Sequence, residues 1–101
     1  MDKVVVAYST APDSDTAQKI ARSLVEQKLA ACVSMTPGLL SIYRWQGVVE
    51  EAKEVGLTIK TTQSRVAALS AALQTLHPYE VPELIVAQVT NGLPAYLQWV
   101  R

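Results

Sequence analysis

The fold of this chain is decided by residues 30–61, which read AACVSMTPGLLSIYRW, QG and VVEEAKEVGLTIKT in succession. The first run is rich in apolar, β-branched and aromatic residues and is interrupted once, at Pro37-Gly38, where we expect a bulge or bend. In the last run every second position from Val55 to Ile59 is apolar, which is the period of a half-buried strand. The sequence therefore predicts two long strands joined at Gln46-Gly47.

The two predicted strands are long for so short a chain. Each has about 14 residues and would reach roughly 45 Å if straight, at roughly 3.3 Å per residue. A compact chain of this size has a radius of gyration of only about 13 Å. We therefore expect the hairpin end, which carries Tyr43 and Trp45, to project beyond its own domain and to lie on another surface. This length argument predicts an oligomer.

The segments on either side of the hairpin supply the other predicted elements. They are a central strand at 4–9, buried on both faces; an amphipathic helix at 14–28, capped by Asp13 or Ser14; a second helix, capped by Thr62 or Ser64 and ended by Pro78; a strand at 84–89; and a short last helix from Pro94, packing through Tyr96, Trp99 and Val100. This β-α-β-β-α-β order predicts an α+β, ferredoxin-like split fold with both main helices on one face of an antiparallel sheet. The chain is expected to form a single domain over residues 1–101.

Composition narrows the function classes. Of the 101 residues, 50% are hydrophobic and 18% are charged, so partner subunits are expected to cover excess apolar surface. Nine Lys+Arg balance nine Asp+Glu, so no net charge favours nucleic acid or an anionic membrane as a partner. Cys32 is the only cysteine, which excludes an intramolecular disulfide. With no signal-peptide pattern at the start and no apolar run of about 20 residues, we expect a cytoplasmic protein.

Several short runs occur in order along the chain and together resemble the CutA divalent-cation tolerance family. They are TAPD at 10–13, LAACV at 29–33, SIYRWQG at 41–47, KTT at 60–62, HPYEVPE at 77–83 and YLQW at 96–99. The resemblance implies a small cytoplasmic homotrimer of ferredoxin-like protomers, similar in architecture to the PII signal proteins, with hairpins that interlock around the three-fold axis. It also implies a link to tolerance of copper and other divalent cations. No cofactor is required, and Cu(II) or another divalent cation is the candidate ligand.

One part of the family pattern is missing. Some enterobacterial members carry a Cys directly after the first strand and a His-His pair before the Pro-Tyr motif, and these three side chains are assigned as copper ligands. The matching residues here are Ser9, Leu76 and His77. Because only His77 is retained, the resemblance does not imply a complete Cys/His/His copper site.

The candidate metal ligands are His77, Glu80 and Glu83. Imidazole is a common ligand for divalent metals, but one nitrogen is too few for a closed site. Carboxylates from another subunit, including the arm acids at 50, 51 and 54, are candidates to complete it. The structural alternative for His77 is a bond to the last carbonyls of the preceding helix, where the dipole favours a cation.

Other candidate positions have structural explanations that we favour. Cys32, in an apolar strand, is expected to be a small buried hydrophobe. Lys60, followed by two threonines, is a candidate anion site at a strand end. A further set of aromatic residues could line a ligand cleft between subunits, although such residues more often anchor interfaces: Tyr43, Trp45, Tyr79, Tyr96 and Trp99.

The sequence does not predict an enzyme, because its single histidine has no visible orienting partner and no nucleophile elbow is present. Two hypotheses remain. The first is a non-enzymatic homotrimer of divalent-cation tolerance or response that binds Cu(II). The second is a PII-like signalling or scaffold module whose clefts bind a small metabolite or an unknown partner protein, with metal binding incidental.

Overall fold

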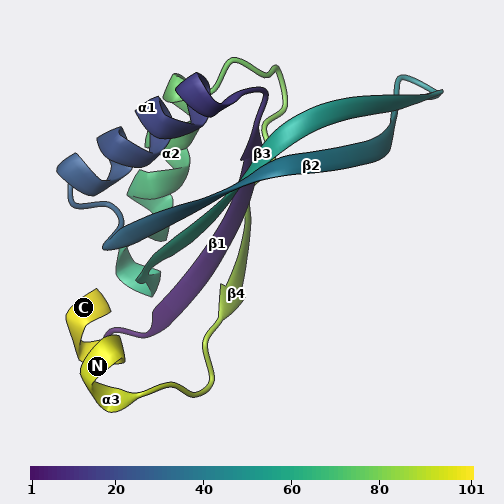
Figure 1. Cartoon of the computed structure of the whole chain (residues 1–101). Helices are drawn as coiled ribbons and strands as arrows, with labels where there is room; N and C mark the ends of the chain where they lie inside the picture. The colour runs from purple at the N-terminus through teal and green to yellow at the C-terminus, as the bar shows by residue number, and fades with distance from the viewer.

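The computed structural model describes residues 1–101 as a four-stranded antiparallel sheet with two helices packed on one face (Figure 1). The elements are β1 (Val4–Ala11), α1 (Ser14–Glu26), β2 (Cys32–Trp45), β3 (Val48–Thr62), a 3-10 turn (Gln63–Arg65), α2 (Val66–Leu76), β4 (Ile85–Gln88) and α3 (Pro94–Val100). The strand order is β2-β3-β1-β4, and all three neighbouring pairs are antiparallel. The predicted α+β, ferredoxin-like fold is confirmed.

The hairpin of β2 and β3 turns where the sequence predicts. Gln46 and Gly47 both have positive φ angles, 49° and 81°, as a two-residue hairpin turn requires. The predicted irregularity at Pro37-Gly38 is also present, because the pairing register shifts between Thr36 and Leu39. The hairpin extends well beyond the rest of the sheet (Figure 1), and the molecule measures 44 × 25 × 23 Å.

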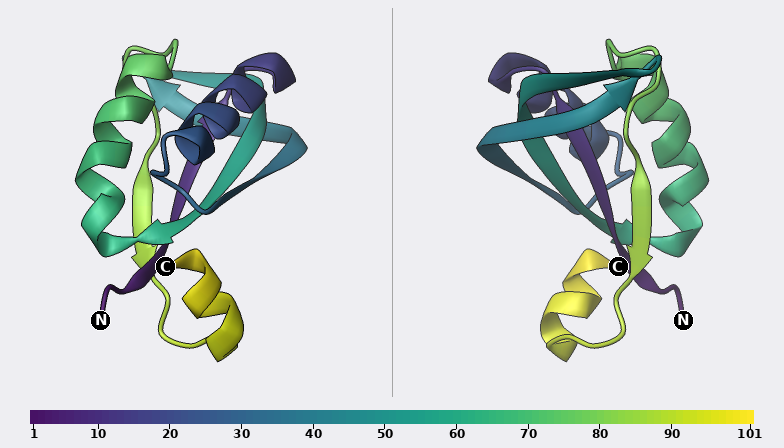
Figure 2. Two further views of the ribbon diagram at one scale, coloured as in Figure 1. Left: turned by 90° about the vertical axis from the view of Figure 1, so that its left-hand side faces the viewer. Right: turned by 90° about the vertical axis from the view of Figure 1, so that its right-hand side faces the viewer.

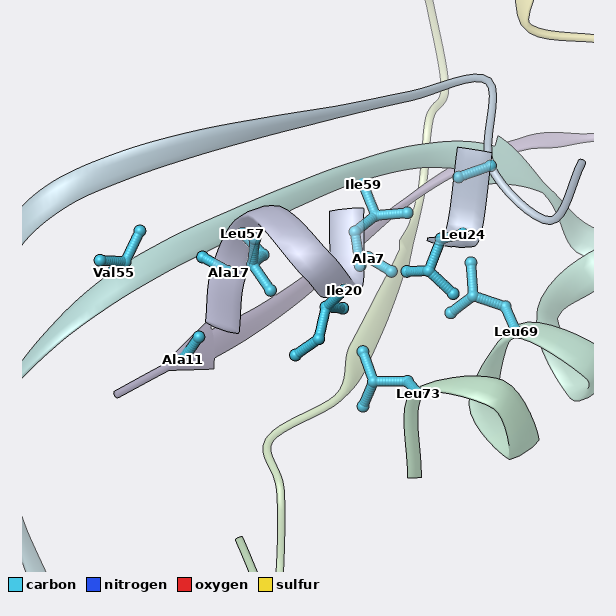
Figure 3. Close-up of a cluster of buried hydrophobic side chains, with 11 residues drawn as sticks. Ala7, Ala11, Ala17, Ile20, Leu24, Val55, Leu57, Ile59, Leu69 and Leu73 are labelled. Carbon is cyan, nitrogen blue, oxygen red and sulfur yellow. The ribbon is translucent and has the colours of Figure 1, made fainter. Parts of the chain in front are cut away.

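The core lies between the two helices and the sheet, where β1 and the near half of β3 supply its buried residues (Figure 3). On β3 the apolar residues of the predicted alternation, from Val55 to Ile59, are buried against the helices. Helix α1 contributes Ile20 and Leu24, and α2 contributes Leu69 and Leu73. The first helix begins as predicted, since the Asp13 carboxylate accepts a hydrogen bond from the Thr16 N–H at 2.7 Å.

The sheet face away from the helices has no cover within the chain. Strand β1 is central, as predicted, but the expectation that it is buried on both faces is wrong: Tyr8 on its outer face is 40% exposed. The physical reason is that α1 and α2 both lie on the same side of the sheet (Figure 2). None of the helices is both long and apolar enough to cross a membrane.

Helix boundaries differ from the predictions in two places. Helix α1 ends at Glu26 because Lys28 adopts a left-handed conformation, and the Leu29 and Ala30 N–H groups fold back onto the Leu24 carbonyl. The second helix begins with a 3-10 turn and has no side-chain cap, because the Ser64 hydroxyl instead donates to the Asp2 carboxylate.

The last helix begins at Pro94 as predicted, but its packing differs. Val100 is buried, whereas Tyr96 and Trp99 are 43% and 59% exposed and lie against each other with ring centroids 5.7 Å apart. A helix of two turns has only one side that can contact the body of the molecule. The prediction that both rings pack inside the chain is therefore wrong.

Candidate functional site

A cleft of about 760 Å³ lies between the outer half of the hairpin and the loop that joins α2 to β4, residues 77–84. We call these the cleft and the 77–84 loop. Six lining residues come from β2 and β3 on the turn side of the bulge, five come from the loop, and one comes from the end of β1. The full lining is Thr10, Ser41, Ile42, Tyr43, Trp45, Glu50, Glu54, Pro78, Tyr79, Glu80, Val81 and Glu83.

The bulge in β2 decides which side chains face the cleft. Thr36 pairs with Gly56 and Leu39 with Glu54, so β2 advances three residues while β3 advances two. One extra residue reverses the alternation of side chains along a strand. Tyr43 and the residues in phase with it therefore share a face with Glu54, and without the bulge they would point to the other side.

Glu54 is the half-buried carboxylate of the cleft. The Tyr79 hydroxyl donates a hydrogen bond to its Oε2 at 2.8 Å. Burial alone would raise the pKa of Glu54, but the hydroxyls of Ser41, Tyr79 and Thr10 outweigh it and place the pKa below the usual value. Burial and the neighbouring Glu54 raise the pKa of Tyr79. At neutral pH the pair is thus a neutral donor on an ionised acceptor, which is a charge-assisted hydrogen bond.

His77 lies behind the cleft wall and is 7% exposed. Its Nε2 is 2.6 Å from the Thr10 carbonyl oxygen, and its Nδ1 accepts the Tyr79 N–H at 3.1 Å. A backbone N–H can only donate, so Nδ1 carries the lone pair and Nε2–H donates to Thr10. The side chain thus bonds strand β1 rather than the last carbonyls of α2, which was the structural alternative from sequence.

Ser9 and Leu76 occupy the other two positions at which the resemblance places copper ligands in some enterobacterial members. The Ser9 hydroxyl is buried and donates to the Glu83 carbonyl at 2.7 Å. Leu76 is at the exposed end of α2. All three positions lie at the same end of the molecule, yet Ser9 and His77 are both used here to hold the 77–84 loop against the end of β1.

The predicted metal ligands are only partly brought together. Glu80 and Glu83 line the cleft, whereas both ring nitrogens of His77 are already hydrogen-bonded. No group of three or more His, Cys, Asp or Glu side chains in this chain is placed to hold a metal ion. The donor set of one chain therefore does not fit a closed metal site, and the site at His77, Glu80 and Glu83 stays a prediction that needs a second chain.

Of the other predicted ligand or interface positions, three meet in the cleft, and Lys60, Tyr96 and Trp99 do not. Tyr43, Trp45 and Tyr79 are part of its lining. Lys60 lies elsewhere on β3, paired with Cys32, and Trp99 is on α3 at the far end of the molecule (Figure 1).

The segment after Lys60 is structural. The Thr61 hydroxyl is buried and donates to the Leu29 carbonyl at 2.6 Å, which leaves that group unavailable to an anion. Cys32 is half-buried rather than buried as expected, because it lies on the uncovered face of the sheet.

Sequence reasoning treated Glu54 as one of several arm acids and left Ser41 and Thr10 out. The signal that identifies Glu54 is its phase: it falls on the same face as Gly56 and directly precedes the buried positions that begin at Val55. A carboxylate at that point is close to the sheet body and has hydroxyl neighbours, unlike the acids further out.

Residues 5–101 match the family model described as "CutA1 divalent ion tolerance protein". The chain belongs to this family. The divalent-cation tolerance protein CutA of Thermus thermophilus is 46% identical over 101 residues, which are 100% of this chain and 96% of that protein. A Xenopus laevis CutA homolog is 51% identical over 94 residues, 93% of this chain.

The solved structures agree with this assignment. The crystal structure of CutA from Xylella fastidiosa matches with a TM-score of 0.94 and 48% identity, covering 97% of this chain and 94% of that one. The chain spans 62% of the length of the Xenopus laevis relative, so the animal CutA proteins contain segments that it does not match. The family description refers to tolerance of divalent ions and names no reaction.

Proposed function

We propose that this CutA chain is a non-enzymatic, cytoplasmic homotrimer of divalent-cation tolerance or response, with Cu(II) as the first candidate ion. The observation that carries the assembly is the outer half of the hairpin. Leu40, Ile42, Val48 and Val49 lie there with more than half of their surface exposed. Apolar side chains left exposed on both faces of a projecting arm are typical of an interface. The number of three subunits comes from the family resemblance.

The charge of the cleft supports a role with cations. Four carboxylates line it, Glu50, Glu54, Glu80 and Glu83, and no Lys, Arg or His does. Such a surface attracts cations. Because one chain lacks a closed donor set, we propose that carboxylates of a neighbouring subunit complete the coordination.

Native mass spectrometry of the purified protein, with and without one Cu(II) per chain, tests this proposal. A trimer that takes up copper in a fixed ratio in the presence of a weak competing chelator is the expected result. A monomer would overturn the assembly. A trimer with scattered, easily removed copper would overturn the specific cation site and favour the second candidate function.

That second candidate is a PII-like module that binds a small metabolite or a partner protein. The observation that favours it is the cleft itself, whose volume lies in the range of small-molecule sites, about 300–1,000 Å³. Carboxylates together with the rings of Tyr43, Trp45 and Tyr79 favour an organic ammonium ligand, since aromatic faces attract cations. Titration of a Trp99→Phe variant with spermidine tests this, because Trp45 is then the only tryptophan. Its fluorescence should change with spermidine and stay constant with an uncharged polyol of similar length.

A further inference from the structure

The 77–84 loop is held by hydrogen bonds at both ends and near its middle. The His77 ring bonds the Thr10 carbonyl at one end, and the Ser9 hydroxyl bonds the Glu83 carbonyl at the other. Between them Tyr79 reaches Glu54 on β3. Ser9 and Thr10, which are consecutive residues of β1, thus fix the two ends of the 77–84 loop, and this loop forms one wall of the cleft.

Within this arrangement His77 controls the position of Tyr79 directly. Its Nδ1 accepts the Tyr79 N–H, and the two rings are in contact with centroids 4.6 Å apart. The backbone bond fixes the chain direction at Tyr79, and the ring contact fixes the direction of its side chain. The Tyr79 hydroxyl then meets Glu54 at 2.8 Å.

We propose that His77, through its bonds to the Thr10 carbonyl and the Tyr79 N–H, holds the 77–84 loop in place as the wall of the cleft. We call this pair of bonds the closed latch. We also propose that the closed latch and a metal ion on His77 exclude each other. A metal ion binds the lone pair of an imidazole nitrogen. The only lone pair is on Nδ1, where the Tyr79 N–H already occupies it. The latch itself needs no metal, whereas the exclusion of a metal ion rests on the proposed cation function.

Coordination through Nε2 does not avoid the conflict. The ring proton would have to move to Nδ1, where it would face the Tyr79 N–H, a second donor. The Thr10 carbonyl would lose its donor at the same time. By either route the Tyr79 N–H loses its acceptor on His77, and coordination through Nε2 also breaks the bond to the Thr10 carbonyl of β1. The closed latch and a metal ion on His77 therefore exclude each other.

Amide hydrogen exchange of the whole, metal-free protein tests the latch. The Tyr79 N–H should exchange at least about tenfold more slowly than an unstructured amide, and His77→Ala should remove this protection. His77→Asn is the matched rescue, because an Asn side-chain oxygen accepts the N–H two residues on in the same way. His77→Gln loses that acceptor and should behave like His77→Ala. Leu76→Ala, at an exposed neighbouring position, is the control that should leave the rate unchanged.

The second half is tested by the same exchange experiment in the presence of one Cu(II) per chain, with EDTA added before the amides are read by NMR. Nitrogen hyperfine coupling in a parallel EPR spectrum of wild type, compared with His77→Ala, reports whether copper is on His77. If it is, Tyr79 should exchange as fast as in His77→Ala.

Two results would overturn the inference: a Tyr79 amide that is unprotected without metal, or one that remains protected while copper is on His77. Protection that persists because copper never reaches His77 supports the latch. That result would count against His77 as a ligand in the proposed cation function, so the failures of the two proposals are distinguishable.

Discussion

The near and far halves of the hairpin carry similar apolar residues in different surroundings. On β3, Ile59 is fully buried under the helices, whereas Val48 and Val49 are 58% and 63% exposed. The strand is continuous between them, and only the reach of α1 and α2 changes. The near half of the hairpin thus forms part of the core, and the far half exposes apolar side chains that nothing in the chain covers. Substitutions of the same kind in the two halves should therefore affect different equilibria.

The largest effect is expected in the near half. Ile59→Ala removes a fully buried side chain and should lower the free energy of unfolding by about 2–5 kcal/mol. Val49→Ala, in the far half, should change the stability of the separate chain by less than about 0.5 kcal/mol. Urea unfolding at several protein concentrations measures both, since only a loss at the interface depends on concentration. If both variants lost the same unfolding free energy at every protein concentration, the hairpin would not be divided into a core half and an interface half.

The next effect concerns assembly. Trp45→Ala should weaken the proposed trimer by about 2 kcal/mol per protomer, as expected for an aromatic anchor in an interface. Trp99→Ala removes the same ring from α3, away from the hairpin, and should have a smaller effect. Sedimentation at decreasing protein concentration compares the two. A larger loss for Trp99→Ala would place the main contact at α3 instead.

Sequence reasoning succeeds for the features of the hairpin that are encoded locally. The strands, the turn at Gln46-Gly47 and the bulge at Pro37-Gly38 were predicted because period, turn chemistry and proline act over a few residues. The side-chain phase beyond the bulge could not be predicted, because it depends on how many residues the partner strand advances. Tyr43 and Glu54 share a face only as a result of that count.

The partners of His77 and Glu54 could not be predicted for a different reason. The Thr10 carbonyl is 67 residues from His77 in sequence, and Tyr79 is 25 residues from Glu54. No periodic pattern encodes hydrogen bonds over such separations. The sequence could name His77 as a candidate functional residue, but only the fold places its two nitrogens against two backbone groups.

A smaller effect is expected from the bond that joins the loop to the hairpin. Tyr79→Phe removes the donor to Glu54 and should cost about 1 kcal/mol at neutral pH. The pKa of Glu54 is lowered on folding from its ordinary 4.5, so this stabilisation is present above that pH and is lost as pH falls through the lowered value. The pKa of Tyr79 is raised from 10.0, so the stabilisation is also lost as pH rises above 10.

Stability measured from acid to alkaline pH tests this window. Wild type should gain stability relative to Tyr79→Phe between those limits, and the two curves should converge outside them. In a Glu54→Gln background, the stability difference between Tyr79 and its Phe replacement should no longer change at acid pH, because no carboxylate is left to titrate. Parallel curves at every pH would mean that the phenol packs in the cleft wall without a functional bond to Glu54.

The smallest effect on assembly is expected at His77, and it separates the loop from the hairpin. All side-chain bonds of His77 are to Thr10 and Tyr79 of its own chain, and the ring is buried. His77→Ala should therefore leave the oligomer intact, because the apolar half of the hairpin holds it, while the 77–84 loop becomes mobile. Elution of this variant at the mass of a single chain in size-exclusion chromatography would contradict this prediction. It would mean that the hairpin of the neighbouring subunit packs against the 77–84 loop and needs that loop to be held on β1.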